Sequence, residues 1–95
     1  MSEQDETRKP LRVLLVEDSP EDAELIAWEL RRAGYDLTLT TVSHPNDLAA
    51  ALQRQRWDLI LSDYKLPGFS AVDALRIMHE HGADLPFIIV SGSVG

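Results

Sequence analysis

Carboxylates follow two of the most apolar stretches of the sequence. Glu17 and Asp18 come directly after LRVLLV (11–16), and Asp63 comes directly after LILS (59–62). If both stretches are neighbouring strands of a parallel sheet, their carboxyl ends meet at one edge and bring the three acids together. Carboxylates crowded in this way repel one another, which raises their affinity for a proton or a hard cation. Mg²⁺ prefers such oxygen ligands, so the sequence predicts a magnesium site.

A cation beside Asp63 would also change what this carboxylate can do. With the charge of an incoming phosphoryl group shielded, a carboxylate oxygen can attack phosphorus and form an acyl phosphate. Ser91 ends another apolar stretch, PFIIVS (86–91), and its hydroxyl and nearby backbone N–H groups could hold the phosphoryl oxygens. The less specific interpretation is that Asp63 is a solvated turn residue, and that Glu17 and Asp18 only favour a helix dipole.

Hydrophobic periodicity predicts the elements that position these side chains. Near-continuous apolar runs indicate buried strands, and an alternating run, YDLTLTTV, indicates a strand at a sheet edge. The predicted strands are 11–16, 35–42, 57–62 and 86–91, and the predicted helices begin after Ser19, near Asn46 and after Ser70. The order βαβαβαβ predicts an α/β fold, in which a parallel sheet carries helices on both faces through right-handed crossovers.

Two of the predicted helices begin with recognisable caps. Ser19 precedes Pro20 and lies three residues before Asp22, and Ser70 lies three residues before Asp73. Serine followed at this spacing by an acidic residue is typical of a capping box, and proline is favoured at the first helical position.

Composition limits the class of protein. A chain of 95 residues with 44% hydrophobic and 26% charged residues is one globular domain. Residues 1–10 are polar and unlike a secretory signal, no apolar run is long enough to span a bilayer, and there is no cysteine, so we expect a cytoplasmic protein with a flexible leader at 1–10. The net charge of −7 argues against nucleic-acid binding by this chain.

Three stretches, VLLVEDSPEDAELI, DLILSDYKLPG and PFIIVSGS, resemble the receiver domain of two-component response regulators, in the same order and spacing over residues 11–95. The resemblance implies a flavodoxin-like, doubly wound parallel sheet. It also implies that Asp63 accepts a phosphoryl group from a histidine kinase or phosphotransfer protein, and that Ser91 contacts that group. Mg²⁺ would be bound by Glu17, Asp18, Asp63 and the backbone carbonyl of Lys65. Such a module assists its own phosphorylation and is not a turnover enzyme.

The sequence departs from the family at its end. Receivers continue through one more helix, strand and helix, and the fifth strand ends in a lysine that pairs with the acyl phosphate. We therefore expect residues 11–95 to form an incomplete receiver. The strand at 86–91 would have an open edge, which predicts a homo-oligomer joined through that edge. Ala71, where the family often has glycine, is a minor change.

Other functions fit the sequence less well. The same fold could serve as a scaffold or self-assembly module without phosphorylation. Phosphatases with an aspartyl nucleophile resemble one another in a second aspartate two residues later, where this chain has Lys65. No glycine-rich loop follows the first strand, which argues against nucleotide or flavin binding. His44, His79 and His81 lack partners at ligand spacing and are interpreted as surface residues.

Trp28 lies beside the apolar stripe of the first helix rather than within it. Packing at the edge of the core is the favoured interpretation, and an exposed contact surface is the alternative.

Overall fold

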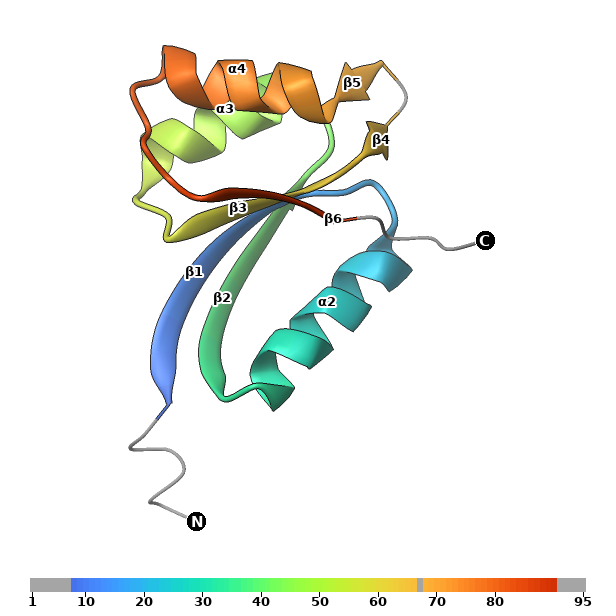
Figure 1. Cartoon of the computed structure of the whole chain (residues 1–95), viewed down its shortest axis with the longest axis vertical. Helices are drawn as coiled ribbons and strands as arrows, with labels where there is room; N and C mark the ends of the chain where they lie inside the picture. Colours follow the sequence, from blue (N-terminus) through green and yellow to red (C-terminus); the bar gives the residue numbers. More distant parts are fainter. Residues whose placement is uncertain (1–7, 67, 91–95) are drawn as a thin grey trace.

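The computed structural model describes residues 8–66 and 68–90. Its main sheet has four parallel strands in the order β2-β1-β3-β6 (Figure 1). The elements are β1 (Lys9–Val16), α2 (Pro20–Arg32), β2 (Tyr35–Val42), α3 (Pro45–Arg54), β3 (Leu59–Asp63), β4 (Lys65–Leu66), β5 (Phe69–Ser70), α4 (Ala71–Glu80) and β6 (Phe87–Val90). This arrangement confirms the predicted α/β class, the parallel sheet and the position of the strand 35–42 at an edge.

Helices cover both faces of the sheet, α2 on one side and α3 with α4 on the other (Figure 1). Side chains alternate between the faces along each strand, so β1 contributes Leu14 and Val16 to the core under α3 and α4, and Val13 and Leu15 to the core under α2. All four of these side chains are at most 1% exposed. The central strand is therefore buried on both faces, as its continuous apolar run predicts.

Some strand boundaries differ from the predicted ones. β1 begins at Lys9, two residues early, because Lys9 and Pro10 pair with the start of β2. β3 pairs with β1 only from Val13 onward, so Pro10 needs no N–H on that side. β3 itself begins at Leu59 rather than at Trp57, whose buried indole N–H donates a hydrogen bond of 2.9 Å to the carbonyl of Ala51.

A short antiparallel pair, β4 with β5, lies in the segment that we predicted as a loop after Asp63. Each strand has only two residues, too few to show a period-two pattern. Gly68, between them, has φ of +68°, a value that other residues adopt only with strain. The pair buries Leu66 and Phe69 against the core beneath α3 and α4.

The predicted helix caps are present. The Ser19 hydroxyl accepts a hydrogen bond of 3.3 Å from the backbone N–H of Asp22. At α4 the capping box is complete: the Ser70 hydroxyl accepts from the N–H of Asp73, and the Asp73 carboxylate accepts from the N–H of Ser70. The α3 boundary differs by one residue, since the helix begins at Pro45 after His44.

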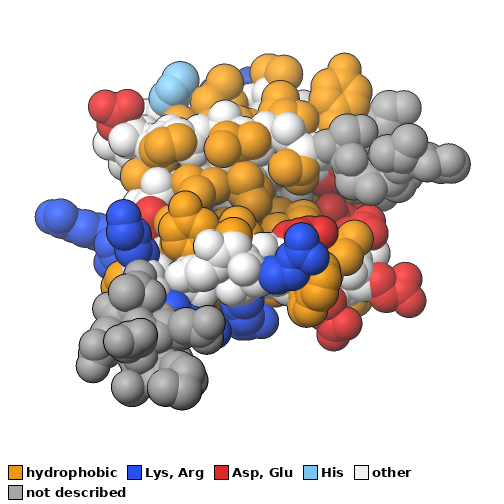
Figure 2. Space-filling model, turned by 60° about the horizontal axis from the view of Figure 1, so that its bottom comes forward, with side chains coloured by type: hydrophobic (Ala, Val, Ile, Leu, Met, Phe, Trp, Pro, Cys, Tyr) orange, Lys and Arg blue, Asp and Glu red, His pale blue; other side chains and the backbone are white. Residues whose placement is uncertain are grey.

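Several large hydrophobic side chains are exposed among the described residues. On β6, Ile88 and Ile89 are 48% and 51% exposed, and among the described strands β6 is hydrogen-bonded to β3 alone. Figure 2 shows a broad group of hydrophobic side chains on one face of the molecule. Trp28 is 54% exposed, so the favoured prediction that it packs at the core edge is wrong.

Among the helices within the described residues, none has the length and apolar character needed to cross a membrane.

Candidate functional site

The pairing of β1 with β3 fixes where the acids lie. Val16 lies opposite Ser62, so Glu17 and Asp63 each stand one residue further along adjacent parallel strands. The backbone N–H of Glu17 donates a hydrogen bond of 2.9 Å to the carbonyl of Val42, which anchors this residue to β2 as well. Asp63 is the last residue of β3 and pairs with Val90 of β6 on its other side. Both carboxylates are therefore held by strands in the middle of the sheet.

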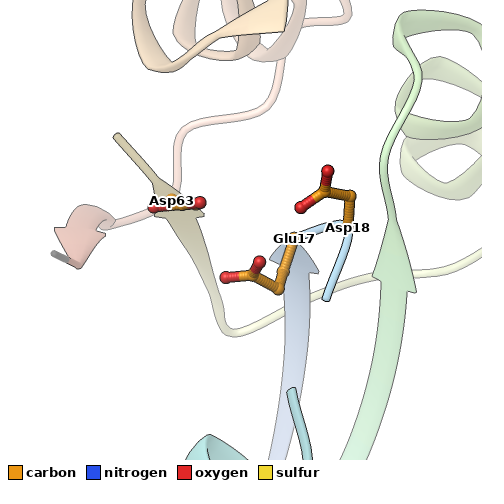
Figure 3. Close-up of side chains that lie close together, drawn as sticks. All are labelled: Glu17, Asp18 and Asp63. Carbon is orange, nitrogen blue, oxygen red and sulfur yellow. The ribbon is translucent and has the colours of Figure 1, made fainter. Parts of the chain in front are cut away.

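Figure 3 shows the carboxylates of Glu17, Asp18 and Asp63 gathered at the carboxyl ends of β1 and β3. One oxygen from each lies within 4.8 Å of the other two, a spacing at which one metal ion could contact all three. Asp18 is exposed, Asp63 is half-buried and Glu17 is only 5% exposed, so the cluster extends from the protein interior to solvent. The structure thus brings together the three predicted acids, and their role as ligands remains a prediction.

Glu17 is the member of the cluster whose environment is most unusual. Its Oε2 accepts a hydrogen bond of 3.1 Å from the N–H of Ser19. Its Oε1 is buried and has no hydrogen-bond partner among the described residues. Burial raises the pKa of this carboxyl above the ordinary 4.5, the Ser19 hydrogen bond opposes that shift, and the charges of Asp63, Asp22 and Asp18 add to it.

These residues fit a bound Mg²⁺. A buried carboxylate oxygen without a donor is costly unless a cation or water satisfies it. Two further carboxylates lie within reach, and the exposed side of the cluster leaves space for the waters that Mg²⁺ retains. The donor set is all oxygen, which suits a hard cation better than a transition metal.

Ser62 is a residue near the site that the sequence analysis did not single out. It is fully buried, and its hydroxyl donates a hydrogen bond of 3.0 Å to the backbone carbonyl of Asp63. The available signal was a lone hydroxyl inside an otherwise apolar strand, directly before the aspartate. A buried hydroxyl needs a hydrogen-bond partner, and here the partner is the carbonyl of the Asp63 peptide, so the bond helps to fix that peptide.

The sequence also predicts site roles for Lys65 and Ser91. Lys65 lies in β4 and pairs with Ser70 of β5, and the role of its carbonyl as a ligand remains a prediction. Ser91 lies outside the described residues. The histidines are exposed, with His44 before α3, and His79 and His81 at the end of α4.

A hollow of about 240 Å³ adjoins the acidic cluster on the side of β2. Glu17, Asp18, Ser43 and Asp47 are among its lining residues, so its wall is acidic as well. A larger hollow, of about 500 Å³, is lined by residues at the amino ends of β1 and β2, remote from the acids. Size alone therefore does not identify the chemical site in this molecule.

Comparison with known proteins agrees with this geometry. Residues 13–94 match the family model of the response regulator receiver domain. The probable transcriptional regulatory protein TcrX of Mycobacterium tuberculosis is 32% identical over 83 residues, covering 87% of this chain and 35% of the relative. The cell cycle transcriptional regulator CtrA of Caulobacter vibrioides is 34% identical over 84 residues, with the same coverages of 87% and 35%. The chain thus spans about a third of the length of these relatives.

Solved structures show the same fold. The receiver domain of the sensor histidine kinase PA1611 from Pseudomonas aeruginosa superimposes with a TM-score of 0.69 at 33% identity, covering 84% of this chain and 66% of that one. That structure has a magnesium ion coordinated in its active site cleft. The chemotaxis response regulator CheY4 of Vibrio cholerae, at 22% identity and a TM-score of 0.71, supports the fold alone. From its sequence match, its sheet and its cluster of acids, the chain belongs to the response regulator receiver domain family.

Proposed function

We propose that this chain is a phosphoacceptor module of two-component signalling, in which Asp63 receives a phosphoryl group from a histidine kinase or phosphotransfer protein. The observation that carries the proposal is the convergence of Glu17, Asp18 and Asp63 within 4.8 Å, with a buried Glu17 oxygen that has no hydrogen-bond partner in the described part of the chain. The magnesium in the PA1611 receiver domain supports the same assignment by analogy. Glu17, Asp18, Asp63 and the Lys65 carbonyl are the proposed ligands.

In the proposed reaction, an Asp63 carboxylate oxygen attacks phosphorus and the bond from phosphorus to the donor nitrogen breaks, leaving an acyl phosphate on Asp63. Bound Mg²⁺ would supply positive charge to the phosphoryl oxygens and so reduce their repulsion by the acids. Ser62 holds the Asp63 peptide, Ser19 holds Glu17, and we assign the Ser91 hydroxyl to the phosphoryl group. The product stays covalently bound, so the chain acts as a signalling acceptor and not as a turnover enzyme.

The test is adduct formation at Asp63. The chain is incubated with Mg²⁺ and acetyl phosphate, or with beryllofluoride, and compared with Asp63→Asn by intact mass and by fluorine NMR. We expect an adduct in the native chain and none in the variant. Asp58→Asn is a matched control, because Asp58 lies at the opposite end of β3 and bonds to Arg12. No adduct on a folded native chain would contradict the proposal.

A second function, self-assembly without phosphorylation, is favoured by the exposed β6 edge. Ile88 and Ile89 are about half exposed, and an apolar strand edge is a template for pairing with another chain. We propose that two copies associate through this edge. Light scattering after size-exclusion chromatography should give at least twice the monomer mass at micromolar concentration, and a folded monomer would contradict this proposal.

Composition further suggests a cytoplasmic location and no nucleic-acid binding by this chain.

A further inference from the structure

We propose that the hollow at the amino ends of β1 and β2 is a binding site for a small anion that carries several phosphate groups. The hollow measures about 500 Å³, within the range of small-ligand sites. It is lined by Arg8, Lys9, Arg31, Arg32 and the turn 33–35. This site is distinct from the acidic cluster and from the function proposed for it.

The fold brings these basic side chains together from two separate segments. Lys9 and Tyr35 are paired residues at the start of β1 and β2, so the beginning of β1 lies beside the residue that follows the α2–β2 turn. Gly34 adopts φ of +104° and makes this turn short, which keeps the last turn of α2 close to the sheet. Arg31 and Arg32 are in that last turn.

The charge of the hollow contrasts with that of the whole chain. The chain has nine lysine and arginine residues, and four of them line this one hollow, although the net charge of the chain is −7. Among the described residues, those that line it include no carboxylate. Basic residues at a helix carboxyl end offset the helix dipole, which accounts for Arg31 and Arg32. That explanation does not extend to Arg8 and Lys9, which precede or begin a strand.

The side-chain types favour phosphate over carboxylate. Three of the four cations are arginines, whose planar guanidinium binds phosphate oxygens in pairs. The Arg32 guanidinium lies 5.1 Å from the ring centre of Trp28, a stacking contact that limits its rotation. A phosphate group carries roughly 1.5 to 2 negative charges, so two or three of them could neutralise four cations within this volume. An acidic peptide, by contrast, carries single charges spaced about 3.3 Å apart along its chain, so its charge is less concentrated than that of linked phosphate groups.

The hollow is well separated from the acids. It lies at the amino end of β1 and the acids lie at the carboxyl end, and eight strand residues span roughly 26 Å. An anion in the hollow therefore avoids most of the repulsion from the acidic cluster.

The test uses tripolyphosphate as the probe, in Mg²⁺-free buffer of low ionic strength. Backbone amide shifts of the ¹⁵N-labelled chain are followed, and we expect the largest changes at Lys9, Gly34 and Tyr35. The double variant Arg31→Gln/Arg32→Gln should weaken binding about tenfold or more, because each arginine provides charge-assisted hydrogen bonds. The matched control Arg54→Gln/Arg56→Gln removes the same charge outside the hollow and should weaken binding less than about twofold.

If the double variant loses its fold, Arg8→Gln/Lys9→Gln replaces it with the same expectation. Equal weakening by the control would mean diffuse charge attraction and would overturn the proposal. Tighter binding of an oligoglutamate peptide than of tripolyphosphate would also overturn it, because it would indicate an acidic protein partner. Shifts confined to the acidic cluster, or none at all, would exclude the hollow as a phosphate site.

Discussion

The two carboxylate oxygens of Glu17 lie in different environments. Oε2 accepts a hydrogen bond from the N–H of Ser19, whereas Oε1 is buried, finds no donor within 8–66 and 68–90, and lies near other negative charges. In the absence of a cation, the ionised carboxylate is therefore less favourable in the folded chain than in the unfolded chain. Glu17 should therefore lower the stability of the metal-free folded chain, and we expect a bound metal ion to offset this cost.

Replacing Glu17 with Gln should raise the free energy of unfolding at neutral pH without Mg²⁺. The folded-state pKa of Glu17 is raised above 4.5, mainly by burial, so its contribution becomes destabilising as pH rises from 4.5 through the folded value. Well below pH 4.5 the carboxyl is protonated in both states and the two proteins should converge. Urea unfolding across this range measures the difference. Asp18→Asn is the control, and a less stable Glu17→Gln variant at neutral pH would contradict the account.

Mg²⁺ should stabilise the native chain by mass action, because the acids meet only in the folded state. At a concentration of a hundred times its dissociation constant, the gain is about 2.7 kcal/mol. Thermal unfolding with and without Mg²⁺ measures this gain, and we expect it to disappear in Asp63→Asn. An equal gain from Mg²⁺ in the variant would place the ion elsewhere.

At the scale of elements, α4 depends on its first turn. The Ser70 and Asp73 side chains cap each other's backbone N–H groups at 3.1 and 3.2 Å. Ser70→Ala should lower the free energy of unfolding by about 1 kcal/mol. Ser70→Asp keeps an acceptor at this position and should remain close to the native stability. Equal losses in both variants, measured by urea unfolding, would show that the cap is not the cause.

α3 is held to the sheet by buried apolar side chains. Leu48 is fully buried in the core under α3 and α4, so Leu48→Ala should cost about 2 to 5 kcal/mol through lost burial and a cavity. Val72 on α4 is 74% exposed, and Val72→Ala should change stability by about 0.5 kcal/mol or less. Comparable losses from both substitutions would contradict this description of the core.

The sequence predicted the elements where one local signal decides the outcome. The apolar run 11–16 and the caps at Ser19 and Ser70 are signals of this kind, and each of these elements is present, although β1 begins two residues before the predicted strand. Trp57 was misplaced in a strand, because its apolar character did not reveal the hydrogen bond to Ala51. The β4–β5 pair depends on tertiary packing of Leu66 and Phe69 and has no local period.

The sequence likewise predicted only some of the residues that the fold brings together into candidate sites. The acids could be predicted because each directly follows an apolar strand, and strand order then brings them together. The basic hollow could not be predicted, because Lys9 and Arg32 are far apart in the sequence and meet only through the pairing of Lys9 with Tyr35.

At the scale of the whole molecule, the proposed association of two copies depends on the β6 edge. A lysine on an edge strand opposes pairing, so Ile88→Lys should shift the mass measured by light scattering to that of a monomer. Val72→Lys adds the same charge at another exposed hydrophobic residue, on α4, and should leave the mass unchanged. Dissociation by both variants would place the contact on a different surface.

The register between β1 and β3 has one more consequence. Side chains alternate between the faces of a sheet, so a slip of one residue would turn Asp63 to the opposite face and separate it from Glu17. A single-residue insertion within Leu59–Ser62 would keep every acid in the chain and still scatter the three carboxylates. Cation affinity therefore depends on the alignment of the two central strands. A chain with a shifted register should not bind the ion at this site, even if it folds compactly.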